Sequence, residues 1–114
     1  MTLVYKICPA AAWHDAKLVG RYHGSADDAR DGFIHFSTAD QLAGTLDKHY
    51  RGQRDLVLIA VDADALGDAL RWEPSRGGEL FPHLYGDLDL VAVRAVHDVQ
   101  VRADGSHAIP ELTS

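Results

Sequence analysis

The sequence predicts an α+β fold for a single domain of residues 1–114, in which a bent or split, mostly antiparallel sheet carries two main helices. Two observations lead to this prediction. Strand-like runs outnumber helical runs, and the connections between them are short, which favours antiparallel pairing over a doubly wound sheet. The length suits one domain that can bury a core without disulfides. We expect that core to span about residues 3–102.

The N-terminal half predicts two strands and both helices. Residues 2–8 are rich in β-branched and aromatic side chains, as strands are, and Pro9 suits the first turn of a helix that Gly20 would end. Residues 21–32 are polar with two glycines, and we expect a loop there. A short strand is expected over 33–37. Apolar residues at helical spacing then predict a helix from Thr38 to Tyr50, with a capping residue at its start.

The C-terminal half predicts strands. Residues 55–62 form the most apolar run and are expected as a central strand with two buried faces. A short helix is expected over 63–70. Residues 71–83 are expected as loop or edge strand, because Pro74 and Pro82 cannot donate to a ladder. Residues 88–102 alternate in polarity and predict one or two strands with room for a bulge. We expect a loosely held tail at 103–114.

Composition limits the classes of function. The net charge of −6 argues against a general nucleic-acid binder but is compatible with a nucleotide ligand. One cysteine excludes an internal disulfide and a multi-cysteine zinc site, and the seven histidines include no HExxH pair, so no metal is expected. No apolar run reaches the length of a membrane span, and the N-terminus lacks the pattern of a signal peptide. We therefore expect a cytoplasmic protein; the sequence does not predict its oligomeric state.

Two histidine motifs carry the strongest functional signal. His35 lies in GFIHFS, where Ser37 would share its face of a strand. His83 lies in FPHLYG, between a rigid proline and a flexible glycine, with Tyr85 on the same face if the chain is extended. We predict that both histidines line one cleft and act as its catalytic residues, since imidazole exchanges protons near neutral pH.

Further residues are assigned to the same cleft. Ser37, Tyr85, Glu73 and Phe81 are predicted to bind the ligand, and Glu73 or Glu79 could serve as a general base beside a histidine. Arg76, followed by two glycines, could hold an anion, although no Walker pattern is present. Cys8 is expected to be buried and inert. The alternative for each histidine stays open: a structural side chain whose ring nitrogens bond to the protein.

Three stretches, YKICPAAAWHDAKLVGRYHGS, GFIHFSTADQL and LRWEPSRGGELFPHLYGDLDLVAV, resemble a bacterial family known as domain of unknown function 952. The resemblance covers about residues 3–96, with an aspartate at 87 or 89 where a proline is expected. That family is similar to the ADP-ribosyltransferase fold, which includes the RNA 2′-phosphotransferases. The resemblance implies two split antiparallel sheets that grip NAD. It places His35 and Ser37 in the cleft, and His83 where the strand with the catalytic glutamate would come. The stretch VYK occupies the position of the first signature of that fold but lacks the arginine or histidine usual there.

Three functions follow as expectations. The first is a transferase of the ADP-ribosyl type that acts on NAD or a related nucleotide. The second is a non-catalytic module that binds a nucleotide or small metabolite. In the third, the histidines serve only the fold. NAD is thus expected as substrate or ligand, without a metal.

Overall fold

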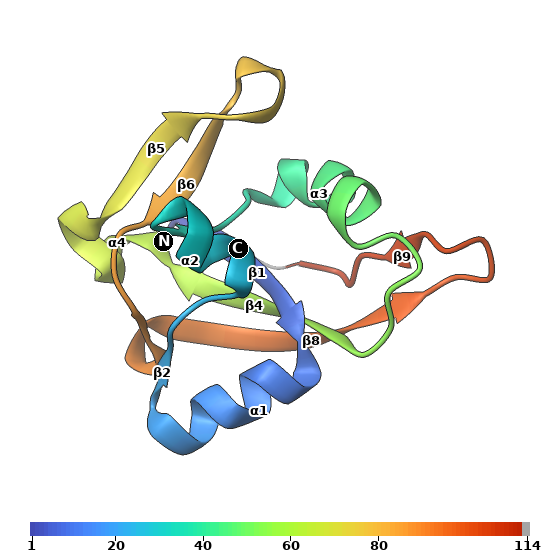
Figure 1. Ribbon diagram of the computed structural model, residues 1–114, viewed down its shortest axis with the longest axis horizontal. Coiled ribbons are helices and arrows are strands. Elements are labelled where there is room, and N and C mark those ends of the chain that lie inside the picture. Colours follow the sequence, from blue (N-terminus) through green and yellow to red (C-terminus); the bar gives the residue numbers. More distant parts are fainter. Residues whose placement is uncertain (113–114) are drawn as a thin grey trace.

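The computed structural model describes residues 1–112 and has the α+β class, with every strand pair in this range antiparallel (Figure 1). The main sheet has the order β1 (Leu3–Pro9), β4 (Leu56–Asp62), β8 (Val93–Val101) and β9 (His107–Ala108). Its β4–β8 register shifts between Ala60 and Val61, where a bulge fits the irregular alternation of the sequence. The predicted class and antiparallel pairing are confirmed.

The core lies on both faces of β4. Val57, Ile59 and Val61 pack on the side that also buries Trp13, whereas Leu56, Leu58 and Ala60 pack on the side that buries Leu42 and Leu46. All six residues of β4 from Leu56 to Val61 are buried. The continuous apolar run therefore predicted the central strand correctly, because successive side chains point to opposite faces and both are covered.

The two predicted main helices cover opposite faces of this sheet (Figure 1). Helix α1 spans Ala10–Val19 and ends at Gly20, which adopts a left-handed conformation with φ 88°. Helix α3 spans Leu42–His49 and follows a 3₁₀ turn, η1 (Ala39–Gln41). Thr38 and Gln41 form a reciprocal capping box at the start of η1, as the sequence suggested.

The prediction of a loop over residues 21–32 is wrong. Arg21–Tyr22 form β2, which pairs with β7 (Leu88–Asp89), and Ala26–Asp31 form helix α2. Ser25 caps α2 in a second capping box, in which its hydroxyl accepts from the backbone N–H of Asp28 and its own N–H donates to the Asp28 carboxylate. These local bonds stabilise a helix too short to form alone.

A second sheet projects beside the main one. Its order is β3 (Ile34–His35), β6 (Leu80–Leu84) and β5 (Leu70–Pro74), and η3 (Arg76–Gly78) forms the tip of the β5–β6 hairpin (Figure 1). The expectation of loop or edge strand over 71–83 holds for β5 but is wrong for β6, the middle strand. Pro82 is tolerated there because it contributes its carbonyl, which accepts from the Phe36 N–H at 3.0 Å.

Short elements complete the chain. Helix α4 (Ala63–Leu66) and η2 (Gly67–Ala69) occupy the predicted short helix, and η4 (Leu90–Ala92) separates β7 from β8. Within the tail, β9 pairs with β8, and Ile109 and Leu112 pack on the α3 side of the core. Residues 113 and 114 of that tail lie outside the described residues. Among residues 1–112, no helix has both the length and the apolarity to cross a membrane.

Candidate functional site

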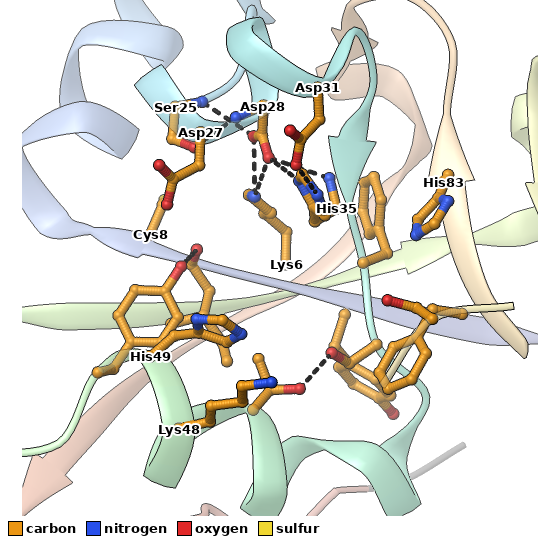
Figure 2. A pocket seen from close by; sticks show the side chains of 18 of the residues that line it. Lys6, Cys8, Ser25, Asp27, Asp28, Asp31, His35, Lys48, His49 and His83 are labelled. Carbon is orange, nitrogen blue, oxygen red and sulfur yellow. Dashed lines mark hydrogen bonds and ion pairs between the residues drawn. The ribbon is translucent and has the colours of Figure 1, made fainter. Parts of the chain in front are cut away.

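A cavity of about 540 Å³ opens between α2, α3 and the strands that carry the two histidine motifs (Figure 2). Its walls include β1 residues on one side and the tip of the β5–β6 hairpin on another. Four of the predicted site residues line it: His35, Ser37, Phe81 and His83. The volume falls in the range of small-molecule sites, which is roughly 300–1,000 Å³.

The two histidines are neighbours on paired strands. His35 of β3 lies opposite His83 of β6 in the register, and their ring centroids are 5.6 Å apart with the rings nearly edge to face. Phe33 stacks on the His83 ring at 4.0 Å and lies 4.6 Å from His35. Cross-strand pairing thus brings together two motifs that are distant in sequence.

His35 is bonded at both ring nitrogens. Its Nδ1 lies 2.6 Å from Asp28 Oδ1 and its Nε2 lies 2.9 Å from Asp31 Oδ2. Both ring nitrogens therefore face carboxylate oxygens, which fix the orientation of the His35 ring at the cavity wall.

Asp28 is the centre of the polar network. It accepts from Lys6 Nζ at 2.9 Å, from the backbone N–H of Ser25 at 2.9 Å and from the backbone N–H of His35 at 3.1 Å. Lys6 and Asp28 are each only 3% exposed. Burial by itself raises the pKa of Asp28, but the hydrogen bond from His35 and the Lys6 ammonium outweigh it, so the pKa lies well below its usual range. The carboxylate thus stays ionised at neutral pH.

Sequence reasoning missed Lys6 and Asp28. Lys6 lies in a strand that was predicted from its apolar residues alone. Asp28 lies in a segment that was expected to be a loop. A local signal existed: Ser25 followed three residues later by Asp28 is the pattern of a capping box. That box fixes α2, and Asp28 and Asp31 then lie one turn apart on its end towards β3, as Figure 2 shows.

His83 has a carboxylate partner of its own. Its Nδ1 lies 2.9 Å from Glu73 Oε1, which also accepts from the Tyr85 hydroxyl at 2.7 Å. The hydrogen bond from Tyr85, and then that from His83, lower the pKa of Glu73. This carboxylate holds Nδ1, whereas Nε2 has no hydrogen-bond partner within residues 1–112. This is the arrangement of a histidine oriented as a general base.

The remaining predicted residues divide between two positions. Ser37 is buried, and its Oγ lies 3.1 Å from Thr45 Oγ1 of α3 in the cavity wall. Phe81 lies beneath the Arg76 guanidinium at 5.0 Å. Glu73 and Tyr85, predicted to bind ligand, are not part of the cavity wall and lie behind His83. Glu73 bonds to the His83 ring and Tyr85 bonds to Glu73, so these two side chains orient His83.

Cys8 lies in the cavity wall but is buried, and burial raises the pKa of its thiol to about 11. It is therefore protonated at neutral pH and a poor nucleophile. Among residues 1–112, no three His, Cys, Asp or Glu side chains are grouped so that they could hold a metal ion.

The fold and site define the class: an α+β protein with a polar cavity bordered by two histidine–carboxylate pairs. The chain belongs to the family described as "Protein of unknown function (DUF952)", whose model matches residues 7–96. It is similar to protein CC0527 from Caulobacter crescentus, whose crystal structure has 50% identity, a TM-score of 0.91 and 94% coverage of each chain. The solution structure of CC0527 has 51% identity and a TM-score of 0.83, covering 93% of this chain and 91% of that one. Comparison with the curated proteins finds no match.

Proposed function

We propose that the cavity binds NAD or a related nucleotide and that His83 acts on it as an acid–base group. The observation that carries the proposal is the pairing of His35 and His83 on adjacent strands, each bonded to a carboxylate, at the wall of one cavity. A nucleotide offers hydroxyls and phosphates, which suit this mixture of donors and acceptors.

The reaction that fits best is transfer of the ADP-ribosyl type. In it, the bond from ribose to nicotinamide breaks, nicotinamide leaves with the bonding electrons, and an acceptor hydroxyl attacks the ribose carbon. His83 Nε2 is free to take the proton from that hydroxyl. The positive charge that develops on the ribose is stabilised by negative charge nearby, and Asp31, about one third exposed, lines the cavity but shares its charge with His35 and Arg30.

One observation favours a second candidate, a nucleotide-binding module without catalysis. Both ring nitrogens of His35 lie against carboxylates, so neither faces a ligand freely and the ring serves to position a ligand. Catalysis then depends on His83 alone. If His83 serves only to orient the ligand as well, the cavity binds a nucleotide and leaves it unchanged.

The test incubates purified protein with NAD and candidate RNA or protein acceptors and measures released nicotinamide. We expect release by the native protein and loss of release in His83→Asn, with His14→Asn on the exposed surface of α1 as the matched control. A thermal-shift titration with NAD accompanies it, since a ligand specific for the folded state raises the melting temperature. A shift of the melting temperature without release of nicotinamide identifies the binding module. If NAD produces neither a shift nor release, the proposal is contradicted.

A further inference from the structure

The charges around the cavity are divided between two sides. Asp27, Asp28 and Asp31 come from α2, whereas Lys48 and His49 come from α3 on the opposite side, as Figure 2 shows. The acidic side is neutralised by its own partners, because Lys6, Arg30 and His35 form ion pairs with these aspartates.

The α3 side is not neutralised. Arg76, from the tip of the β5–β6 hairpin, joins Lys48 and His49 in lining the cavity there. Within residues 1–112, none of these three side chains forms an ion pair with a carboxylate. Lys48 and Arg76 therefore bring positive charge to the cavity of a chain whose net charge is −6, and this local charge would attract an anionic ligand.

Arg76 is held in place by α3. Its Nη1 donates to Thr45 Oγ1 at 3.3 Å and its Nη2 donates to the Gln41 carbonyl at 3.4 Å, while the guanidinium lies over Phe81. These contacts use two of the five N–H donors of an arginine. The others are available to an anion, and the planar group binds phosphate oxygens in a fork.

Gly44 makes room for this guanidinium. A Cβ added at position 44 would lie 2.9 Å from Arg76 Nη2. Glycine inside a helix is less favourable than alanine, so its place in the middle of α3 needs a compensating contact. The bare backbone lets the arginine lie flat against the helix at the cavity wall.

The pKa of His49 depends on the charges around it. Burial, and then the positive charges of Lys48 and Arg76, lower the pKa of its ring, whereas Asp27 acts in the opposite sense. His49 is thus neutral at neutral pH and offers a hydrogen bond, while Lys48 and Arg76, both near enough to affect it, supply the positive charge.

We propose that Arg76, Lys48 and His49 form a subsite for a phosphate or pyrophosphate group. The inference rests on the proposed nucleotide site and adds the orientation of the ligand: its phosphates lie against α3 and the hairpin tip, and its ribose faces the histidine pair. Gly44 is part of the same subsite, because it sets the position of the Arg76 guanidinium.

The experiment measures binding of three probes by calorimetry: inorganic pyrophosphate, adenosine and ADP. It compares the native protein with Lys48→Gln, Arg76→Gln and the control Lys17→Gln on the exposed end of α1. We expect ADP and pyrophosphate to bind about 10- to 100-fold more weakly to each cavity variant, the size expected for losing one hydrogen bond to a charged group. Adenosine binding should be unchanged in all variants.

Each outcome separates the subsite from the nucleotide site. If ADP and adenosine bind equally and neither cavity variant differs from Lys17→Gln, the subsite is wrong and the nucleotide site stands. If pyrophosphate binding depends on Lys48 and Arg76 while adenosine adds nothing, the subsite stands and the nucleotide proposal fails. Absence of binding by all three probes overturns both. Lys48 is exposed, so its variant tests the subsite even if Arg76→Gln unfolds.

Gly44→Ala provides a test that leaves every charge in place. The added methyl group should displace the Arg76 side chain, because the nearest atoms are the movable end of that arginine. We expect ADP to bind about tenfold more weakly, the lower end of the loss of one charge-assisted hydrogen bond, with the melting temperature equal to or above that of the native protein. Unchanged ADP affinity would show that Arg76 does not hold the phosphate.

Discussion

At the residue scale, the Asp28 carboxylate determines how the site is built. It is buried, yet it accepts hydrogen bonds from Lys6, from His35 and from the backbone of Ser25. Removing one partner of a buried ion pair leaves the other charge without compensation, which costs far more than the pair contributes when intact. The stability of the fold and the position of His35 therefore depend on the same side chain.

Replacing Asp28 with asparagine should strongly destabilise the protein. We expect a loss of about 3–5 kcal/mol in the free energy of unfolding, because Lys6 would stay buried without its counter-charge. Urea denaturation measures it. Asp27→Asn is the matched control. The Asp27 side chain is 72% exposed, so this substitution should change the free energy of unfolding by less than about 0.5 kcal/mol. Equal effects of the two substitutions would contradict the assignment of the buried pair.

The same carboxylate should make stability depend on pH. The pKa of Asp28 is lower in the folded than in the unfolded state, so its contribution is fully present above the ordinary aspartate pKa of about 3.9. That contribution is lost as the pH falls towards the lowered pKa of the folded state. We expect the native protein to lose more unfolding free energy than Asp28→Asn between neutral pH and about pH 3. Parallel losses in the two proteins would show that Asp28 is not the group responsible.

Glu73 should influence catalysis without contacting the ligand. It fixes the tautomer of His83 from behind the cavity, so Glu73→Gln should lower kcat about 10²- to 10⁴-fold with little change in KM. Nicotinamide release measures both constants. Glu79→Gln, on the same hairpin and exposed, should leave them unchanged. A rise in KM alone would indicate that Glu73 binds ligand instead, as the sequence had suggested.

The sequence showed the histidine motifs but not their partners. His35 and His83 are flanked by residues with strong local preferences, so each could be placed at a strand edge from its neighbours alone. The partners Lys6 and Asp31 have no such marker, because ion pairing between distant elements leaves no periodic pattern in one sequence; Asp28 is marked only by its place in the capping box. Glu73 was named as a candidate, but its position behind His83 depends on the hairpin register.

At the scale of elements, helix α2 is the part whose form follows from a single local motif. It has six residues and relies on the capping box between Ser25 and Asp28. The sequence prediction weighed its polarity and glycines and missed this pattern. The prediction for β6 failed because Pro82 argued against a middle strand. Its partner β3 is only two residues long, and the backbone N–H that bonds the Pro82 carbonyl belongs to Phe36, just after β3.

Loss of the cap should loosen α2 and the site with it. Ser25→Ala removes the acceptor for the Asp28 backbone N–H and should cost about 1 kcal/mol of stability, as is typical of N-caps. Amide hydrogen exchange should then speed up in residues 26–31 first, because a local opening needs less free energy than global unfolding. Ser106→Ala is the control, because it removes a serine hydroxyl that bonds to Asp104 in the turn before β9, far from α2 in the sequence. Uniformly faster exchange throughout the chain would contradict a local role for Ser25.

At the scale of the whole molecule, the antiparallel topology brings the site together. The main sheet was predictable because β4 is apolar on both faces and must be central. The second sheet could be expected only in outline, since its strands are short and its register pairs His35 with His83 through tertiary contacts. The cavity arises where α2, α3 and the second sheet meet, and its charge division follows from which helix supplies each wall.

The central claim is that a nucleotide binds beside His35 and His83, and NMR of protein labelled with ¹⁵N in its histidine rings tests it most directly. Before ligand is added, the Nδ1 signals of His35 and His83 should each report the hydrogen bond to a carboxylate, Asp28 and Glu73 respectively. Saturation with NAD should shift these two ring signals and leave His14 and His97 unchanged as internal references. If NAD raises the melting temperature while the signals of His35 and His83 do not move, the ligand binds elsewhere and the claim is contradicted.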